Sequence, residues 1–264
     1  MNIKMYIITH KEFLKPQING YYSLLVGAFN KNIKTDFKDN TNNNISKKNK
    51  NYCELTGLYW MWKNGHEDVQ GLCHYRRYFT KSWISKNPKY FLTTQDISQL
   101  MQKYDVIMPV RRFYKEKVIE AINVAPNMQD IKEMEKALSA LCPEYLSTYH
   151  NYLNGNECYL YNMCIMKKEL LEQYCEWLFK ILFYIEDNYF VDNDDPYRSR
   201  LFGFLSERLI YVWLKKNIDT KKIKEIRVVK TDEKNLWLIG QDLKNILRNI
   251  YFYTKNHMKR GNRW

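Results

Sequence analysis

The sequence predicts an α/β domain built on a mostly parallel sheet that is flanked by helices. Short apolar runs typical of buried strands occur at residues 3–8, 71–79 and 105–109, and helical patterns separate them. The chain has 264 residues, of which 45% are hydrophobic and 16% aromatic, so it can bury a sizeable core. We expect one domain over residues 1–235 and a basic amphipathic helical tail over residues 236–264.

The formal net charge of +13 indicates an acidic partner, which is a nucleotide, a nucleic acid or an anionic membrane surface. The 6 cysteines form no Cys-x-x-Cys pair and mostly lie inside apolar runs, which favours buried thiols in a reducing cytoplasm over disulfides or zinc sites. The apolar run at the start is too short for a signal peptide, and no window approaches the ~18 uncharged apolar residues of a membrane-spanning helix. We expect a cytoplasmic protein that is at most peripheral to a membrane.

The run at residues 3–8 predicts a short buried strand, and Thr9, His10 and Lys11 follow it directly. In α/β proteins, ligands gather just beyond the carboxyl ends of strands. Thr9 and His10 are therefore candidates for contact with the base or ribose of a nucleotide. An ordinary turn explains these residues equally well.

A solvated loop is expected over residues 30–51, where Asn, Lys, Asp and Thr dominate. A helix follows, with Asn51 as its N-cap and Glu54 as the partner in a capping box. Aromatic and apolar residues then recur at helical spacing up to Trp62, and Gly65 ends the helix. A role as cap partner explains Glu54 at least as well as contact with a ligand.

Residues 71–79 are expected to form the next strand, in which a histidine and two arginines lie among aromatic residues. Alternation along an extended strand places His74, Arg76 and Tyr78 on one face and Arg77 on the other. Guanidinium groups pair with phosphate or carboxylate, and a phenol and an imidazole add further donors. This face therefore predicts an anion-binding site. A half-exposed strand whose arginines reach water is the structural alternative.

The elements that follow continue the alternation of strands and helices. The helix after Lys168 has a continuous apolar stripe, which indicates core packing rather than a cofactor site. The expected helices lie at 96–104, between 115 and 152, from 168 and from 196, and the expected strands at 105–109, 157–166 and 226–229.

An acidic turn at residues 192–196 precedes the last of these helices. Asp195 is a natural N-cap there, and Pro196 suits the first helical position. The Asp-x-Asp pattern in this turn resembles the pairing that holds a divalent metal on a diphosphate. A solvated capping turn explains it better.

Arg200, Glu207 and Arg208 are polar residues in or beside the last helix, and Arg208 falls within its apolar face. An unpaired charge in such a position is costly, and the seven-residue spacing puts Arg200 and Glu207 along one side. A catalytic interpretation makes Glu207 a general base and the arginines partners of phosphate or carboxylate. A structural ion pair that ties the helix to the sheet explains the pattern equally well.

The signatures of P-loop, dinucleotide-binding, zincin and nucleophile-elbow proteins are absent from the sequence. The chain resembles a bacterial family of capsular and exopolysaccharide glycosyltransferases that has long been classed as a domain of unknown function. Only the basic tail falls outside the resemblance. The motifs that carry it are residues 6–11, 71–79, 104–109, 161–168 and 203–209.

The resemblance implies a GT-A-like, Rossmann-type fold and a nucleotide-sugar-dependent hexosyltransferase. The implied donor is a UDP-sugar, most favourably galactose in pyranose or furanose form. The implied acceptor is a lipid-linked oligosaccharide of capsule or exopolysaccharide synthesis. The basic tail would dock on an anionic membrane surface, which places the enzyme at the inner face of the plasma membrane.

The resemblance also assigns residues to the donor. The end of the strand at 71–79 is where GT-A enzymes place their metal-binding aspartates, but no Asp-x-Asp stands there. Either arginines neutralise the leaving diphosphate, or other carboxylates hold Mg²⁺ or Mn²⁺. The residues implied to bind the donor are Thr9, His10, Lys11, His74, Arg76, Arg77 and Tyr78.

On the acceptor side, the resemblance implies Asn162 and Met163, with Arg200 and Arg208 as further candidates. An inverting single displacement needs one carboxylate to deprotonate the acceptor hydroxyl. Glu207 is the preferred base and Asp195 the second candidate.

Our interpretation includes no nucleic-acid partner, but a nucleic-acid-binding protein is the alternative from another class because of the basic, aromatic-rich composition. That alternative predicts one continuous basic groove, whereas an enzyme should hold its arginines in a pocket. A third alternative is a non-catalytic scaffold for the polysaccharide machinery.

Overall fold

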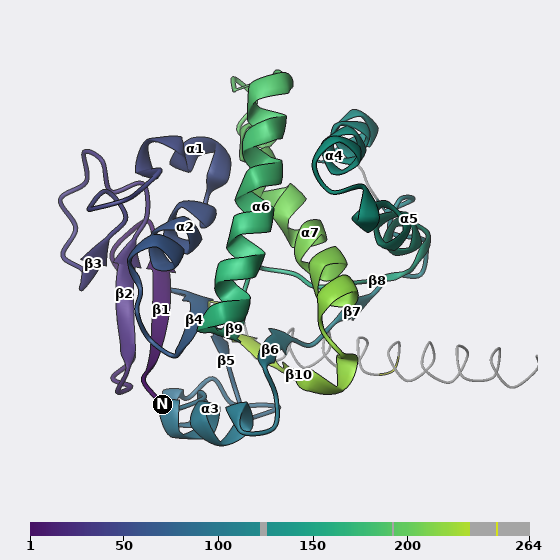
Figure 1. Ribbon diagram of the computed structural model, residues 1–264. Coiled ribbons are helices and arrows are strands. Elements are labelled where there is room, and N and C mark those ends of the chain that lie inside the picture. The colour runs from purple at the N-terminus through teal and green to yellow at the C-terminus, as the bar shows by residue number, and fades with distance from the viewer. Residues whose placement is uncertain (122–125, 192, 233–246, 248–264) are drawn as a thin grey trace, which may run out of the picture.

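The computed structural model describes residues 1–121, 126–191, 193–232 and 247, and the architecture below concerns those residues. A nine-stranded mixed sheet forms the centre (Figure 1), and its main path has the order β10-β6-β9-β4-β1-β2-β3. Strands β5 and β11 lie off this path, where β5 pairs with both β4 and β11. The strands of this sheet are β1 Ile3–Thr9, β2 Tyr21–Leu25, β3 Phe37–Lys38, β4 Val69–His74, β5 Arg77–Phe79, β6 Val106–Pro109, β9 Cys164–Lys167, β10 Ile223–Ile226 and β11 Val228–Lys230.

Most neighbours along the main path are parallel. β3, β2, β1 and β4 run in one direction, as do β6 and β10 beside each other, whereas β9 is antiparallel to both β4 and β6. Ile8 pairs with His74, so β1 and β4 end at the same edge of the sheet. The predicted mostly parallel α/β sheet is confirmed, and this shared edge is where its ligand-binding loops begin.

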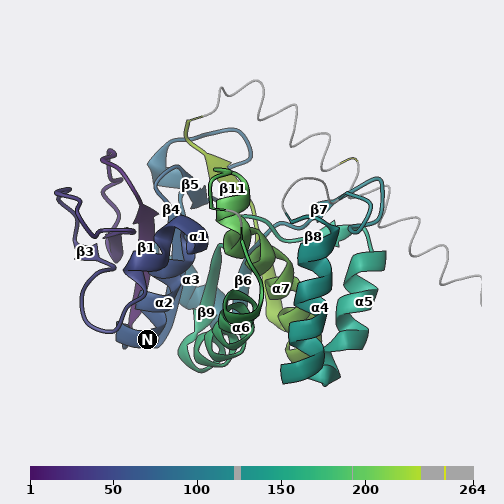
Figure 2. The same cartoon turned by 90° about the horizontal axis from the view of Figure 1, so that it is seen from above.

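Helices pack around the sheet and form a second lobe beside it. α6 contacts β4 and β9, and α2 and α7 pack against α6. Figure 2 shows α4 and α5 side by side and set apart from the sheet, next to the small β7–β8 sheet. The helices are α1 Asn49–Tyr52, α2 Leu55–Asn64, α3 Thr94–Met101, α4 Met128–Leu141, α5 Leu146–Asn154, α6 Lys168–Asn188 and α7 Leu201–Asn217. The short elements are the strands β7 Arg112–Phe113 and β8 Glu157–Cys158 and the 3₁₀ turns Ser46–Lys48, Pro88–Tyr90, Pro143–Tyr145, Arg198–Arg200 and Thr220–Lys222.

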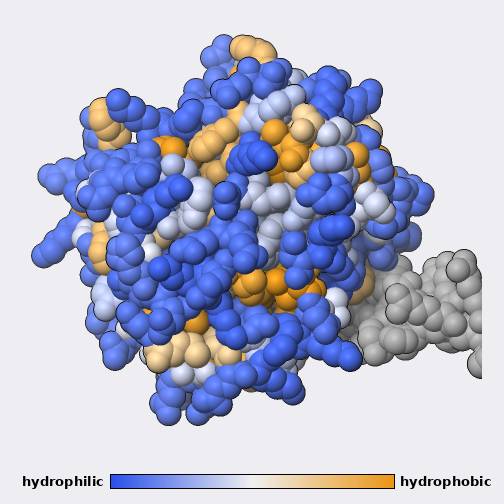
Figure 3. Space-filling view, in the orientation of Figure 1, coloured by the Kyte–Doolittle hydropathy of each residue, from blue (hydrophilic) through white to orange (hydrophobic). Residues whose placement is uncertain are grey.

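The core lies between the sheet and α2, α6 and α7. The predicted apolar stripe of α6 is buried there, from Leu171 to Ile185, and Trp213 of α7 packs against Tyr174. All six cysteines are free thiols, and all but Cys53 are buried. The surface in the orientation of Figure 1 is mostly hydrophilic, with small separate hydrophobic patches (Figure 3).

The prediction of one extended strand over residues 71–79 is wrong. β4 ends at His74, the chain turns at Tyr75 and Arg76, and β5 begins at Arg77, which pairs back onto His74. Strand β5 is held in place by β11, since Arg77 pairs with Lys230. Because the run is a hairpin, alternation does not apply across it, and the predicted faces are wrong as well.

The predicted capping box before α2 is also wrong. Cys53 separates α1 from α2 with a φ of 50° and a ψ of −126°, and neither Asn51 nor Glu54 caps a helix through its side chain. The Asn51 amide instead donates to the carbonyl of Ser199 at 2.9 Å, and Glu54 is held by another residue, described below. Gly65 ends α2 as predicted, in an extended conformation.

Three further boundaries differ from the expected ones. The expected strand at 157–166 is split into β8 and β9, because Tyr161 and Asn162 adopt left-handed conformations with φ of 80° and 51°. The expected strand at 226–229 is replaced by β10 and β11. The last helix begins at Leu201 rather than at Pro196, which lies in the preceding turn.

The polar loop at 30–51 is anchored by one buried carboxylate that the sequence did not single out. Asp39 is fully buried and accepts hydrogen bonds from the backbone N–H groups of Gly27 and Ala28 and from the hydroxyls of Ser46 and Thr56. These bonds tie the loop to the ends of β2 and α2.

The predicted basic tail falls outside the described residues except for Leu247, so its boundary and conformation stay predictions. Within the described part of the chain, no helix combines the length and hydrophobicity needed to cross a bilayer.

Gly71, at the centre of the sheet, gives a test of this packing. A methyl group added there would collide with the Met5 side chain and press on Ile165. We expect Gly71→Ala to lower the free energy of unfolding by about 1–3 kcal/mol through overpacking. Chemical denaturation measures this change.

Gly203→Ala is the matched control. Its new methyl group would meet only Cys53 at ordinary contact distances, and alanine favours the helix by up to about 1 kcal/mol. We expect this variant to be as stable as the parent or more so. Equal stabilities of the two variants would contradict the register of β4 between β1 and β9.

Candidate active site

A two-residue turn, Tyr161–Asn162, connects three parts of the chain at the edge where β1 and β4 end. The Tyr161 carbonyl lies 2.7 Å from Nε2 of His74, and its N–H donates to Oε1 of Glu207 at 2.8 Å. The Asn162 amide donates to Oε1 of Glu54 at 2.7 Å. The turn thereby holds the end of β4, the middle of α7 and the start of α2 in one cluster.

The Asn162 side chain is the buried anchor of this turn, with 5% of its surface exposed. Its amide also donates to the carbonyl of Gly203 at 3.0 Å, and its oxygen accepts from the Ser206 hydroxyl at 2.7 Å. Asparagine tolerates the left-handed region better than most residues, whereas tyrosine does so at a cost. Asn162 therefore acts as a positioning residue whose polar atoms are all used within the protein.

Glu207 is the carboxylate whose ionisation is most altered in this cluster. Burial and then the nearby charge of Glu54 raise its pKa from the ordinary 4.5 to about 7, although the Tyr161 N–H and two arginines, Arg208 and Arg77, oppose the shift. A carboxylate with a pKa near neutrality is suited to accept and release a proton at physiological pH. Glu207 also lines a cavity, described below, so it remains accessible.

His74 is buried at the end of β4 and stays neutral. Burial lowers its pKa, Glu54 opposes this, and Arg77 and Arg76 add to the lowering. Because a carbonyl oxygen only accepts, the short contact with Tyr161 places the imidazole proton on Nε2. His74 therefore donates to the turn and cannot supply a positive charge.

The two arginines of the hairpin occupy different environments. Arg77, rather than the expected Arg76, lies beside the cluster. The Arg77 guanidinium lies 4.7 Å from the centre of the Tyr161 ring, and its Nε is buried without a hydrogen-bond partner among the described residues. Arg76 instead forms a half-exposed ion pair with Asp232 at 2.8 Å. Arg77 is thus the arginine that joins His74 and Glu207.

Tyr78 does not join this cluster either. It is buried on the other side of the hairpin, where its ring stacks on Phe91 at 4.6 Å and its hydroxyl donates to the carbonyl of Tyr75. The expectation that His74, Arg76 and Tyr78 share one face is therefore wrong, and the reason is the turn after His74.

A cationic edge surrounds the carboxyl ends of β1 and β4. Burial lowers the pKa of His10, and the charges of Lys31, Lys11, Arg76 and Arg200 lower it further. His10 and Lys11 lie against the Tyr75 ring, at 5.4 and 5.2 Å from its centre. The Thr9 hydroxyl bonds the backbone of Lys11 and shapes this turn. Such a concentration of positive charge attracts an anionic ligand.

Arg200 lies close to both carboxylates, as the sequence spacing suggests. The Cys53 thiol, Glu54 and Glu207 all raise the pKa of Arg200, so its guanidinium is firmly charged. Its guanidinium also lies 5.4 Å from the Phe204 ring. The strained Cys53 backbone belongs to the same corner, where it precedes Glu54.

The other candidate residues lie as follows. Met163 is fully buried in the core, so its predicted place on the acceptor side is not supported. Asp195 accepts hydrogen bonds from the backbone N–H groups of Tyr197 and Arg198 and acts as a capping residue. Arg208 donates from Nη1 to the Phe204 carbonyl, and its Nε is buried without a partner among the described residues.

An aromatic cavity of about 360 Å³ opens beside Glu207 and Arg208. Phe204, Glu207 and Arg208 are spaced three and four residues apart, so α7 presents them on one side. Tyr197 adds a wall from the turn that precedes α7. The remaining walls come from the lobe around α5 and β8, and they are Tyr114, Val118, Ala121, Tyr152, Cys158, Tyr159 and Leu160.

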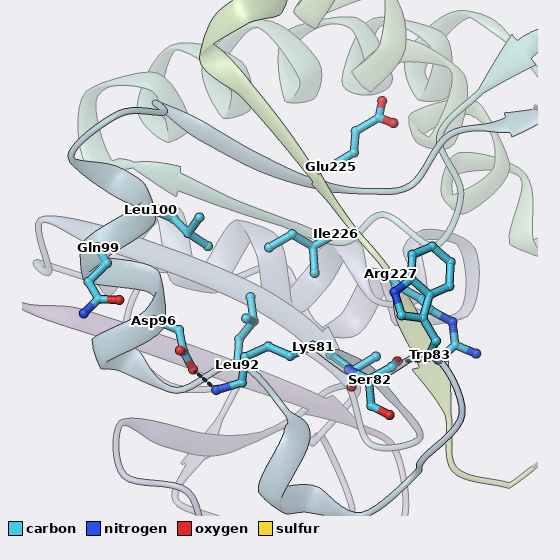
Figure 4. Close-up of a pocket in the computed structure, with 11 residues that line it drawn as sticks. Lys81, Ser82, Trp83, Leu92, Asp96, Gln99, Leu100, Glu225, Ile226 and Arg227 are labelled. Carbon is cyan, nitrogen blue, oxygen red and sulfur yellow. Dashed lines mark hydrogen bonds and ion pairs between the residues drawn. The ribbon is translucent and has the colours of Figure 1, made fainter. Parts of the chain in front are cut away.

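A second cavity, of about 410 Å³, lies between α3 and β10 (Figure 4). Its charged groups are engaged with each other or with residues outside it, since Lys81 pairs with Asp96 at 2.7 Å and Glu225 accepts from Arg111 and Tyr159. It contains none of the residues of the cluster around Tyr161–Asn162. The chemistry of the site therefore concentrates at Glu207.

The described residues do not fit a divalent cation at the end of β4. The chain there carries His74, Tyr75 and Arg76 in place of carboxylates. No cluster of three or more His, Cys, Asp or Glu side chains that could hold a metal ion occurs in the described part of the chain.

Sequence reasoning missed two central features of this site. Nothing in the local pattern indicates that Glu54 meets Asn162, because the two residues lie 108 positions apart. The left-handed turn had one usable signal, an asparagine at 162 within a run expected to be a strand. These contacts bring the Glu54 carboxylate close enough for its charge to raise the pKa of Glu207.

Comparison with known proteins supports the fold and the motifs. A family model described as "Domain of unknown function (DUF4422)" matches residues 4–218, a span that contains every motif of the expected resemblance. Among solved structures, WbbM, described as a bifunctional glycosyltransferase in its apo form, matches with a TM-score of 0.76 at 26% sequence identity. No curated protein gives a significant match.

The match with WbbM covers 88% of this chain and 46% of that protein, so the chain spans about half of WbbM's length. The predicted GT-A-like fold and the predicted family resemblance are confirmed.

Asn162 tests the turn. Asn162→Ala removes three hydrogen bonds, takes the amide donor away from Glu54 and puts alanine in the left-handed region. We expect a loss of about 2–4 kcal/mol in the free energy of unfolding. Asn162→Gly keeps the backbone unstrained and should recover about 1 kcal/mol of this loss. Two variants of equal stability would contradict a strained turn at this position.

Glu207→Gln tests the raised pKa. A carboxyl whose pKa is higher in the folded state than in the unfolded state stabilises the fold fully at a pH below its unfolded-state pKa, here 4.5. This contribution is lost as the pH rises through the folded-state pKa of about 7. Glutamine stays neutral, so the variant should match the parent at pH 5 and exceed it by about 1–3 kcal/mol at pH 8.

Denaturation at the two pH values measures the difference. Glu176→Gln, at an exposed position of α6, is the control and should show no such trend. A parent–variant difference for Glu207→Gln that is constant with pH would contradict the assignment.

Proposed function

We propose that this chain, which belongs to the DUF4422 family, is a glycosyltransferase that uses a nucleotide-activated sugar. The observation that carries the proposal is the meeting of Arg77, whose buried Nε has no hydrogen-bond partner among the described residues, and Glu207, with its near-neutral pKa, at the end of β4. Glycosyl transfer requires both kinds of group, because it needs neutralisation of a leaving diphosphate and deprotonation of an acceptor hydroxyl.

The donor in this proposal is a UDP-sugar, most favourably UDP-galactose in pyranose or furanose form. Thr9, His10 and Lys11 meet the uridine at the end of β1. The diphosphate is bound by Arg77 and by the cationic edge to which Arg76 contributes. The lowered pKa of His10 supports this arrangement, because burial lowers it first and the positive charges of four neighbouring side chains lower it further.

Glu207 is the base of the proposed inverting displacement. Its carboxylate takes the proton of the acceptor hydroxyl while the acceptor oxygen bonds to the anomeric carbon. The bond from that carbon to the diphosphate breaks, and UDP leaves with the electron pair. Burial and then Glu54 keep the Glu207 pKa near neutrality, whereas Asp195 is engaged as a capping residue by two backbone N–H groups.

The proposed acceptor is a lipid-linked oligosaccharide of capsule or exopolysaccharide synthesis. Arg200 and Arg208 lie on either side of Glu207 along the chain and suit an acceptor that approaches from α7. The basic tail would hold the enzyme on the anionic inner face of the plasma membrane, where each Lys or Arg contributes on the order of 1 kcal/mol.

The charge of the diphosphate is met by arginines rather than by a metal in this proposal. The support is chemical, since His74, Tyr75 and Arg76 at the end of β4 include no carboxylate, the ligand that a hard cation such as Mg²⁺ prefers. Arg77 is half-buried and its Nε is enclosed, which also favours an enzyme over a nucleic-acid-binding protein, which would need its arginines along an open groove.

Turnover of nucleotide sugars tests the proposal. Purified protein should release UDP from UDP-galactose or another UDP-sugar of a panel, with activity retained in a chelator of divalent cations. Arg77→Gln should lower kcat/KM by about 10²-fold or more, because it removes a charged donor at the leaving group.

Arg76→Gln is the matched variant, and we expect less than about a tenfold loss because Arg76 forms a half-exposed ion pair with Asp232. A protein that turns over no UDP-, GDP-, CMP- or dTDP-sugar, or an Arg77→Gln variant as active as the parent, would contradict the proposal.

A further inference from the structure

The aromatic cavity beside Glu207 is separate from the cationic edge that the proposed donor uses. None of Thr9, His10, Lys11, Arg76 or Arg77 lines it. Among the described residues, its charged wall residues are Glu207 and Arg208, one of each sign, so these walls do not select strongly for an anion. A ligand of this cavity is therefore different in character from a nucleoside diphosphate.

The walls offer aromatic surface that the fold leaves uncovered. Tyr197 is 47% exposed and packs against Phe204 with the two rings tilted by 35° and their centres 4.9 Å apart. Tyr114 on the opposite segment is also partly exposed, and its backbone is fixed by a 2.7 Å bond to the Asn156 carbonyl. Open aromatic faces around a few polar groups match a ring that has apolar C–H faces and a polar edge. A hexose ring has this shape.

The polar groups of the cavity include the guanidinium side chain of Arg208, which lines the wall. Its Nη1 donates to the Phe204 carbonyl, and its Nε, which is enclosed by protein atoms, has no partner among the described residues. Buried donors are almost always satisfied, so a ligand acceptor atom that a small shift brings to this guanidinium would complete its hydrogen bonds. A sugar hydroxyl supplies such an atom.

Glu207 connects this cavity with the cluster around Tyr161–Asn162. It lines the cavity, while Arg77 and Glu54 act on its pKa from the direction of β4 and α2. A sugar in the cavity would present a hydroxyl to Glu207, with the anionic group of the donor beyond it at Arg77.

We propose that this cavity is the subsite for the terminal hexose of the acceptor glycan, which stacks on Tyr197 and Phe204 and bonds Arg208 and Glu207. The hexose in this subsite belongs to an acceptor only if the proposed glycosyltransferase function holds, so this part of the proposal rests on that function. Binding of a hexose in the cavity is a separate claim, which the next experiment tests without any turnover.

The probes are the methyl glycosides of galactose, glucose, mannose and N-acetylglucosamine, titrated into the full chain and followed by saturation-transfer NMR. At least one should bind with a Kd in the millimolar range, and saturating UDP should leave that binding in place. Tyr197→Ala should weaken binding about threefold to tenfold through loss of one stacking ring. Its exposed position makes loss of folding a minor concern.

Tyr90→Ala removes an exposed tyrosine from a remote 3₁₀ turn and should leave binding unchanged. Arg208→Lys keeps the charge but removes the orphaned Nε, and we expect it to weaken binding without altering UDP affinity. Three results would overturn the inference: no glycoside binds, UDP displaces the glycoside, or Tyr197→Ala binds it as tightly as the parent. Glycoside binding as expected, together with no turnover of nucleotide sugars, would instead sustain the subsite and remove the transferase proposal.

Discussion

The site depends on one backbone constraint, the left-handed turn at Tyr161 and Asn162 between β8 and β9. Its carbonyl fixes the tautomer of His74, its N–H holds Glu207, and its asparagine side chain holds Glu54. These three residues come from β4, α7 and the start of α2, so the turn joins three parts of the chain. A strained local conformation is stable here because the surrounding hydrogen bonds over-determine it. The turn therefore converts a general α/β edge into a cluster with fixed donors and acceptors.

The cluster holds a carboxyl with a raised pKa and buried donors without partners among the described residues, which a purely structural network would avoid. Glu207 has a pKa near 7 because burial and Glu54 outweigh the Tyr161 N–H and two arginines. Arg77 and Arg208, whose charges both act on Glu207, each keep a buried Nε that has no hydrogen-bond partner among the described residues. The fold gives up stability to hold these groups, and such costs concentrate where a ligand supplies the missing partner. The Asp39 anchor shows the contrast, since that buried carboxylate receives four donors from its own loop and helix.

Sequence reasoning reached the fold and the family because their signals are local and repeated. Apolar runs gave the parallel strands, the stripe of α6 gave a core helix, and Gly65 ended α2 as expected. It failed where a distant partner decides the local structure. The segment from His74 to Arg77 contains no glycine, proline or asparagine, and the chain reverses there because β5 pairs with β11 from the end of the domain. Because of that single reversal, Arg77 rather than Arg76 lies beside Tyr161 and Glu207, which is the opposite of the expected arrangement. The contact of Glu54 with Asn162 had no signal in either segment.

The central claim is that Glu207 titrates near neutrality because Glu54 lies beside it in a buried cluster. The most direct test is a ¹³C NMR titration of the Glu207 side-chain carboxyl in the full chain, with its signal assigned by comparison with Glu207→Gln. Our account predicts a midpoint at a pH of about 7 in the parent and a clearly lower midpoint in Glu54→Gln, which removes the neighbouring charge. A midpoint near the ordinary 4.5, or one that Glu54→Gln leaves unchanged, would contradict it.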